Sequence, residues 1–304
     1  MKSIVFGGTG FLGSHIADAL SQRGHEVTIF DKQPSIHING TQKMIVGDIL
    51  DEKMVHDAVS GCDYVYNMAA VADIDECKNR PLDTVKFNVL GNSVILDMAR
   101  QAQIKRYVFA SSVYVYSDSG SFYRTSKRAC ELFIQDYYDR YGIEYTILRY
   151  GSLYGRRADS HNSIYRYLEE ALTKGKITYY GSGDEEREFI HVEDAAFASV
   201  DILDPKFINQ HVILTGQRVM KYRDFLEMIQ EMMGNQIGIE YRRKKSETHY
   251  RISPYAFNPQ LGKKYTARSN IDIGQGLLDC LSEIYEERLG QDWQSGITCG
   301  VQYG

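Results

Sequence analysis

The first candidates for chemistry in the sequence are Tyr123 and Lys127, which lie four residues apart. At the start of a predicted helix, this spacing brings both side chains to one face. A free tyrosine has a pKa of about 10 and is a poor base at neutral pH, but a neighbouring ammonium group favours its ionised form. The pair could therefore act as a general base, although an isolated Tyr-x-x-x-Lys spacing is more often an exposed helix pair.

Two adjacent serines offer hydroxyl groups close to a predicted sheet edge. Ser111 and Ser112 follow the predicted strand Arg106–Ala110. Ligands bind at the carboxyl ends of the strands in parallel α/β sheets, so a serine hydroxyl there could hold a substrate oxygen. We therefore consider the serines and the Tyr–Lys pair together as one candidate site.

The run Gly7-Gly-Thr-Gly-Phe-Leu-Gly13 has the spacing G-x-x-G-x-x-G between a predicted first strand and first helix. Such glycines let the turn close tightly and bring backbone N–H groups against a pyrophosphate at the helix N-terminus. Asp31 ends the next predicted strand, 18 residues after Gly13, where a carboxylate binds an adenosine ribose. A 2′-phosphate would meet a like charge there, so we predict NAD rather than NADP, with Lys32 able to soften this preference. A purely structural turn is the alternative.

Asp48 follows a further predicted strand, Met44–Val46. Its carboxylate could accept a hydrogen bond from the adenine amino group. Alternatively, it could cap the helix that follows it.

The elements that must position these residues alternate along the first half of the chain. The predicted strands are Ser3–Phe6, Glu26–Phe30, Met44–Val46, Tyr64–Met68, Arg106–Ala110 and Tyr145–Arg149, and the predicted helices are Gly10–Arg23, Met54–Val59, Val85–Ala102 and Ser126–Tyr141. Repeated βα units imply an α/β fold, a doubly wound parallel sheet of the Rossmann type with helices on both faces. The polar stretch Val71–Pro81 is predicted to be a ligand-binding loop.

The composition and the pattern of predicted elements change after Gly155. Residues 156–188 and 221–264 are rich in charge and lack regular alternation, which indicates a smaller, interleaved α/β substrate-binding lobe. Phe189–Val192 and Val212–Leu214 are predicted strands that return to the first sheet. We predict an NAD-binding domain of residues 1–155 plus about 189–214, a second lobe of residues 156–188 plus about 215–290, and a loose tail at 291–304.

Composition excludes several classes of protein. The 304 residues carry 35 basic and 40 acidic side chains, and a net charge of −5 does not attract nucleic acid. Because no apolar run of about 18 residues and no signal-peptide core is present, we expect a cytoplasmic protein without a membrane partner. The five cysteines form no C-x-x-C pair, which predicts reduced thiols and no metal site.

Taken together, the sequence resembles the extended short-chain dehydrogenases/reductases, in the branch of nucleotide-sugar epimerases and dehydratases. The resemblance reaches to about Leu289. Besides the residues above, it is carried by Gly47–Ile49, Asn67–Ala70, Asn88 with Gly91, Ala110–Tyr116, Leu148–Gly155 and Arg187–Asp194. It implies NAD as cofactor and a nucleotide-diphosphate sugar as substrate.

The resemblance implies catalytic and cofactor-binding roles for the matching residues. Tyr123 is expected to be the base toward a sugar hydroxyl, with Lys127 bonding the nicotinamide ribose. Ser112 matches the active-site hydroxyl, and Ser111 is the fallback. The residues expected at the cofactor are Gly7, Gly10, Phe11, Leu12, Gly13, Asp31, Lys32, Asp48, Ile49, Ala69, Ala70, Asn88, Ser111, Tyr123, Lys127 and, near the carboxamide, Tyr150.

Two further residues are expected at the substrate. Arg187 matches an arginine that pairs with the substrate diphosphate, a bidentate contact suited to a guanidinium group. The alternative for Arg187 is an exposed ion pair with Glu185 or Glu186. Ser152 stands where relatives carry a substrate-contacting Asn, which indicates rearranged diphosphate contacts.

Departures from the family pattern narrow the reaction. Dehydratases of the family carry an Asp-Glu pair where this chain has Val113 and Tyr114. At the position of Tyr114, the decarboxylases carry a Glu and the 3,5-epimerase/reductases carry a Cys. We therefore predict oxidation at C4 of the sugar, first as a 4-epimerase and alternatively as a 4-dehydrogenase of the GDP-heptose type. A non-catalytic NAD(H)-sensing protein is a third hypothesis, which the intact catalytic residues disfavour. The short spacing of 11 residues from Ser112 to Tyr123 predicts a more open pocket.

The predicted helices Val85–Ala102 and Ser126–Tyr141 correspond to those that form a four-helix bundle between subunits in this family. The second carries apolar side chains on more than one side: Leu132, Phe133, Tyr137 and Tyr138. We expect a homodimer, or a tetramer built from it. The alternative is a helix buried only within the monomer.

Overall fold

The computed structural model describes residues 1–242, 263–265 and 271–289. Its centre is an eight-stranded sheet in which all neighbouring strands are parallel. Across the sheet the strands are β13 (Lys263–Lys264), β10 (Gln210–Leu214), β6 (Tyr145–Tyr150), β5 (Arg106–Ser112), β4 (Tyr64–Asn67), β1 (Lys2–Phe6), β2 (Glu26–Asp31) and β3 (Gln42–Val46). Every side chain of β5 and β6 is buried, as expected for strands covered on both faces.

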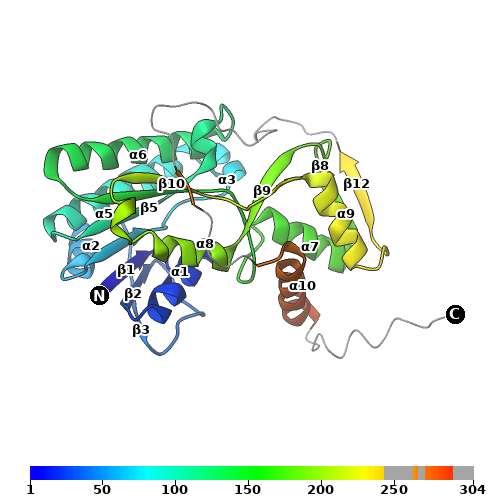
Figure 1. Ribbon diagram of the computed structural model, residues 1–304, viewed down its shortest axis with the longest axis horizontal. Coiled ribbons are helices and arrows are strands. Elements are labelled where there is room, and N and C mark those ends of the chain that lie inside the picture. The colour runs from blue at the N-terminus through cyan, green and yellow to red at the C-terminus, as the bar shows by residue number, and fades with distance from the viewer. Residues whose placement is uncertain (243–262, 266–270, 290–304) are drawn as a thin grey trace.

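Helices cover both faces of this sheet (Figure 1). One face packs against α1 (Phe11–Gln22) and α8 (Val192–Asp201). The other packs against α2 (Glu52–Val59), α5 (Gly91–Gln101) and α6 (Ser121–Tyr141). The predicted doubly wound Rossmann-type architecture is therefore confirmed.

A second group of elements has its own core beside the sheet (Figure 1). Its strands are β7 (Ser152–Tyr154), β9 (Glu186–His191) and β11 (Val219–Lys221) in one sheet and β8 (Lys176–Tyr180) with β12 (Gly238–Arg242) in another. Its helices are α7 (Ser163–Lys174), α9 (Tyr222–Met232) and α10 (Ile273–Leu289). The division of the chain into a cofactor domain and a substrate lobe stays a prediction, and the tail at 291–304 lies outside the described residues.

One of the two strands expected to return to the central sheet does so. β10 pairs with β6, as predicted for Val212–Leu214. The expectation for Phe189–Val192 is wrong, because β9 pairs with β7 and β11 and Val192 already begins α8. A short apolar run indicates a buried strand but does not show which sheet it joins.

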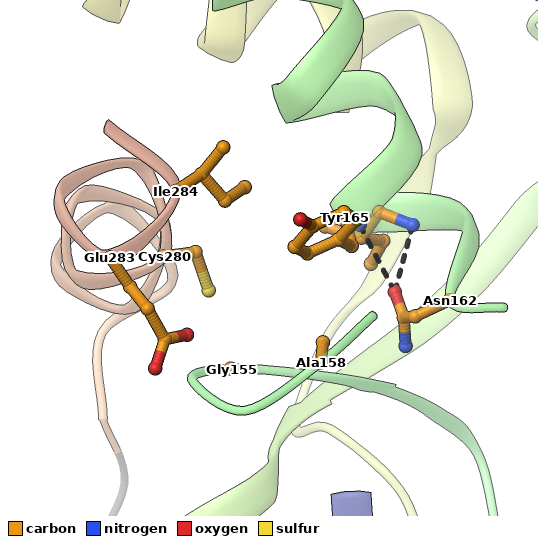
Figure 2. A pocket seen from close by; sticks show the side chains of 8 residues that line it. Gly155, Ala158, Asn162, Tyr165, Cys280, Glu283 and Ile284 are labelled. Atoms are coloured by element: carbon orange, nitrogen blue, oxygen red, sulfur yellow. Dashed lines mark hydrogen bonds between the residues drawn. The ribbon is translucent and has the colours of Figure 1, made fainter. Parts of the chain in front are cut away.

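The junction of α7, α10 and the loop after β7 encloses a small pocket (Figure 2). Asn162 caps α7, and its side-chain oxygen accepts hydrogen bonds from the backbone N–H groups of Ile164 and Tyr165. Cys280 and Glu283 reach toward the loop from α10, and a carboxylate oxygen of Glu283 accepts the backbone N–H of residue 157 at 2.8 Å. The contacts fasten α10 to the chain segment that leaves the central sheet.

The connections near the carboxyl edge differ from the predicted ones. The expected loop Val71–Pro81 contains α3 (Ile74–Asn79). The helix predicted from Val85 begins as α4 (Pro81–Thr84) and passes through a π-helical turn, η1 (Val85–Leu90), into α5. After β5, a 3₁₀ turn, η2 (Val113–Tyr116), leads to α6, and a further one, η3 (Pro205–Phe207), precedes β10.

Helix α6 begins at Ser121, earlier than the predicted Ser126. Two consecutive residues with positive φ, Gly120 at 101° and Ser121 at 49°, turn the chain from η2 directly into the helix. Tyr123 consequently lies in the first helical turn, at the end where the helix dipole favours negative charge.

No helix in the described parts of the chain combines the length and apolar character needed to cross a membrane. The same parts hold no group of three His, Cys, Asp or Glu side chains arranged to bind a metal ion.

Candidate active site

The glycine turn between β1 and α1 is closed so tightly that side chains would not fit. A Cβ atom on Gly7, whose φ is +73°, would lie 2.6 Å from the backbone nitrogen of Ala69. A Cβ atom on Gly13 would lie 2.1 Å from the carbonyl oxygen of Gly7. Gly10 caps α1 without a side-chain hydrogen bond, which leaves the N–H groups of the first turn, at Phe11 and Leu12, without a side-chain cap. The turn therefore fits a phosphate group at a helix N-terminus.

Asp31 lies at the end of β2, beside this turn. Its carboxylate accepts hydrogen bonds from the backbone N–H groups of Thr9 at 3.1 Å and Lys32 at 2.7 Å. The side chain thus connects the end of β2 to the glycine turn. The side chain of Lys32 is exposed.

Asp48 and Ile49 follow β3. The exposed carboxylate of Asp48 accepts the backbone N–H of Leu50 at 3.0 Å. The alternative helix-capping role of Asp48 is wrong, because Asp51 caps α2 by accepting the N–H of Met54. Ile49 packs against the apolar core beneath α5.

Asn88 fixes the segment after β4, where Ala69 and Ala70 lie. Its side-chain oxygen accepts the N–H of Val71 at 2.7 Å, and its nitrogen donates to the carbonyl of Val71 at 3.0 Å and to Ser126 Oγ at 3.1 Å. The amide is therefore engaged with the protein on both sides. It holds the strand end in place beside the glycine turn.

The structure brings Ser112, Tyr123 and Lys127 together from the end of β5 and the first turns of α6. Ser112 is hydrogen-bonded to the Tyr123 side chain, and its Oγ accepts the N–H of Tyr114 at 3.3 Å. Lys127 Nζ lies 5.7 Å from the Tyr123 ring centre and donates to the carbonyl of Ala110 at 2.7 Å. The three residues that the sequence singled out thus form one cluster at the carboxyl edge of the sheet.

Burial shifts both titratable groups of this cluster. It raises the pKa of Tyr123 to about 12, an effect that the hydrogen bond from Ser112 partly offsets. It lowers the pKa of Lys127 to about 8, so the ammonium form still predominates at pH 7. In the protein without cofactor, burial therefore favours the neutral phenol of Tyr123, although Lys127 lies close by.

Ser111 and Tyr150 point away from this cluster. Ser111 Oγ donates to Glu131 Oε1 at 2.5 Å, so its hydroxyl does not face Tyr123. The Tyr150 hydroxyl is hydrogen-bonded to Ser199 Oγ at 2.6 Å within the core beside α8, and burial raises its pKa.

Arg187 and Ser152 lie on the neighbouring three-stranded sheet, in β9 and β7. Arg187 is 4% exposed, donates to the carbonyl of Glu186 at 2.7 Å, and stacks 5.4 Å over the ring of Tyr222. The alternative of an exposed ion pair is wrong, because the side chain is buried. Ser152 pairs with Phe189 across β7 and β9 and stays partly exposed.

Tyr114 belongs to this site, although the sequence pointed to it only as a missing acid. Its ring stands edge-on to Tyr123, with ring centres 6.4 Å apart and an angle of 80°. A Cβ atom on Gly120 would lie 2.8 Å from the Tyr114 ring, so the ring has room here only because residue 120 is a glycine. The short loop therefore brings an aromatic ring against the phenol of Tyr123.

The family model of the NAD dependent epimerase/dehydratase family matches residues 3–213. The chain belongs to this family. It is an extended short-chain dehydrogenase/reductase, an enzyme, and its cofactor is NAD. The tight turn that only glycine allows at Gly7 and Gly13, and the N-terminus of α1 without a side-chain cap, fit the pyrophosphate of this cofactor.

The names of related proteins in this family give different reactions. A protein of Methanocaldococcus jannaschii assigned as a UDP-glucose 4-epimerase is 30% identical over 82% of this chain and 88% of its own length. A UDP-N-acetyl-α-D-glucosaminuronate decarboxylase of Bacillus cytotoxicus is 30% identical over 71% of this chain and 74% of its own.

A solved structure shows the same fold. The UDP-glucose 4-epimerase of Thermotoga maritima with UDP-glucose superimposes with a TM-score of 0.83 at 21% identity. The match covers 94% of this chain and 99% of that chain. The likeness extends over both groups of elements described above.

Proposed function

We propose that this enzyme is a nucleotide-sugar 4-epimerase, which oxidises C4 of the sugar and reduces the ketone again on its other face. The observation that carries the proposal is the cluster of Ser112, Tyr123 and Lys127, at the same carboxyl edge of the sheet as the glycine turn. Val113 and Tyr114, which follow Ser112 in η2, carry no carboxylate that could protonate a leaving hydroxyl. Epimerases among the relatives and solved structures support this choice.

The chain's own residues would act on the proton and on the position of the sugar. Ser112 would hold the C4 hydroxyl, and the Tyr123 phenolate would accept its proton as the carbon becomes a ketone. When bound, NAD⁺ takes up the hydride, and its positive ring favours the phenolate that burial disfavours. After the sugar turns over in the pocket, Tyr123 would return its proton to the same oxygen. Lys127 would bond the nicotinamide ribose and keep positive charge near the phenol.

The cofactor would be held from several elements. We propose that the N–H groups of Phe11 and Leu12 face the pyrophosphate, while the Gly10 N–H closes the turn by donating to the carbonyl of Gly7 at 3.2 Å. Asp31 would bind the ribose hydroxyls beside Lys32, and Asp48 and Ile49 would border the adenine. Ala69 and Ala70 would border the nicotinamide end, whereas the Tyr150 hydroxyl is bonded to Ser199 in the core and does not support the expected contact with the carboxamide. Asn88 would act by holding the segment with the two alanines.

The reaction is tested by incubating the purified enzyme with UDP-, GDP- and dTDP-sugars while following NADH absorbance and product stereochemistry. A product with an inverted C4 centre and no lasting NADH supports the epimerase. Stoichiometric NADH with a released keto sugar would identify a dehydrogenase instead and overturn the proposal. Failure of every sugar to react while NAD stays bound would favour a sensing protein.

Replacing Asp31 by Asn tests the choice of cofactor. The change removes the charge that repels a 2′-phosphate but keeps a side-chain oxygen for the Thr9 N–H. We expect the ratio of NADP to NAD affinity to rise about tenfold, measured by titration calorimetry. An equal loss of affinity for NAD and NADP would show that Asp31 only shapes the turn, and it would contradict the role of Asp31 at the ribose.

Replacing Arg187 by Met tests the proposed contact with the substrate diphosphate. Methionine preserves an unbranched side chain over Tyr222 but removes the charge. Since a charge-assisted contact to a phosphate contributes about 1.5–3 kcal/mol, we expect KM for the nucleotide sugar to rise at least about tenfold. An unchanged KM would assign Arg187 to the packing of β9 alone. Ser152, the first residue of the adjacent strand β7, would add a hydroxyl to the same contact.

We also propose a homodimer through α6 and the helix that runs from α4 to α5. Side chains on these helices are exposed although apolar: Leu82, Val85, Leu90, Leu132 and Phe133. A second copy would cover them in a four-helix bundle. We expect sedimentation to show a dimer at micromolar protein and Phe133→Glu to shift it to monomer. A monomeric unmodified protein would contradict the proposal.

A further inference from the structure

A buried ion pair lies directly behind the proposed catalytic residues. Arg149 in β6 donates from Nε to Glu131 Oε1 at 3.0 Å and from Nη2 to Glu131 Oε2 at 2.6 Å. Arg149 is 2% exposed and Glu131, in α6, is 6% exposed. Separating such a pair would leave an uncompensated charge in the core, so it holds β6 and α6 in one relative position.

Two hydroxyl groups attach the Ser112 segment to this pair. Ser111, immediately before Ser112, donates from Oγ to Glu131 Oε1 at 2.5 Å. Tyr116, the last residue of η2, accepts a hydrogen bond from Arg149 Nη1, and the guanidinium group lies 4.7 Å over its ring. The chain is thus fastened on both sides of the turn that carries Ser112.

The same pair determines the surroundings of Lys127. Glu131 follows Lys127 by four residues on the same helix, a spacing at which lysine and glutamate normally pair. Here both carboxylate oxygens of Glu131 accept hydrogen bonds from Arg149, and the Lys127 ammonium donates to the carbonyl of Ala110 instead. Glu131 therefore makes its hydrogen bonds with Arg149 rather than with Lys127, although its nearby charge still raises the pKa of Lys127.

A third ionisable group, His211 in β10, lies close to Glu131 but adds no charge to the Glu131–Arg149 pair. Its Nε2 lies 3.9 Å from Glu131 Oε2 and 3.3 Å from the side-chain nitrogen of Gln135. Burial lowers the pKa of His211 to about 4, so the ring is neutral near pH 7. The charge of Glu131 is then matched by that of Arg149.

We propose that Ser111, Tyr116, Glu131 and Arg149 form a positioning network, which holds Ser112 against Tyr123 and engages both carboxylate oxygens of Glu131, so that Lys127 donates to the carbonyl of Ala110. The inference rests on the proposed function, because it assigns these residues to the support of that catalytic cluster. None of the four would touch the reacting atoms. Misplacing a catalytic group affects mainly the chemical step, so the network should appear in kcat rather than in binding.

The test removes one hydroxyl at a time, because replacing Glu131 or Arg149 alone would leave a buried charge and could prevent folding. Ser111→Ala and Tyr116→Phe each keep the ion pair. Their matched controls are Ser3→Ala and Tyr66→Phe, which remove buried hydroxyls bonded to His25 and to the carbonyl of residue 199, away from the cluster. kcat, KM, NAD affinity and thermal stability are measured for all four variants with the sugar on which the unmodified enzyme is most active.

We expect Ser111→Ala and Tyr116→Phe each to lower kcat about fivefold while KM and NAD affinity stay within about twofold. The two controls should leave kcat within about twofold of the unmodified enzyme, and Ser111→Thr, which restores a hydroxyl, should recover kcat. An unchanged kcat in both test variants, or an equal loss in the controls, would overturn the network. Inactivity of the unmodified enzyme toward every sugar would instead contradict the proposed function.

Discussion

Replacing Tyr123 by Phe should lower kcat about 10²–10⁴-fold, the usual contribution of a positioned acid or base, and leave NAD affinity within about twofold. The change removes one oxygen from a ring that stays packed against Tyr114. Proton transfer to and from the sugar hydroxyl would then lack its acceptor, whereas the glycine turn remains intact. The measurement is a steady-state assay of the purified variant together with calorimetric titration of NAD.

The matched control for this variant is Tyr137→Phe. Tyr137 lies on the same helix, and its hydroxyl donates to Asp97 at 3.3 Å rather than toward Ser112. Its loss should leave kcat within about twofold of the unmodified enzyme. Turnover by Tyr123→Phe at the unmodified rate would remove the base from the mechanism proposed above.

Replacing Gly13 by Ala should cost the enzyme both NAD affinity and stability. The added methyl group would lie 2.1 Å from the carbonyl oxygen of Gly7, so the turn or α1 must shift. Overpacking of this kind costs about 1–3 kcal/mol of folding free energy. We expect NAD to bind at least about tenfold more weakly, as measured by calorimetry, since the N–H groups of the turn move with it.

Gly238→Ala serves as the control for that substitution. A Cβ atom at Gly238 would have no heavy atom within 4 Å, and this glycine lies in β12, outside the central sheet. It should leave NAD affinity unchanged. Equal NAD affinity in Gly13→Ala and the unmodified enzyme would mean that the turn does not hold the pyrophosphate.

Local patterns were sufficient to predict the parts of the site that short segments build. The glycine spacing before α1, and the placement of Ser112 at the end of β5, depend on residues close together in the sequence. The Tyr123–Lys127 spacing also survives the correction of the helix start from Ser126 to Ser121. The start of the helix was misplaced because Ser121 adopts a positive φ, which is uncommon for a serine and is not predicted by its residue type.

Long-range pairing was beyond these patterns. Arg149 and Glu131 are 18 residues apart and lie on different elements, so only the folded chain shows that Ser111 belongs to them rather than to Tyr123. The course of β9 was missed for a similar reason, because its apolar residues fit either sheet. The alternation of α7 with β8 and of α9 with β12 was hidden by charged residues on the outer faces.

The most direct test of the proposed epimerase uses a nucleotide sugar carrying deuterium at C4. Removal and return of the same hydride predicts that the inverted product keeps the deuterium at C4, detected by mass spectrometry and NMR. Among the sugars accepted in the substrate survey, UDP-glucose is the natural first choice, since it is named for a similar solved structure. Loss of the deuterium together with a released keto sugar would contradict the account.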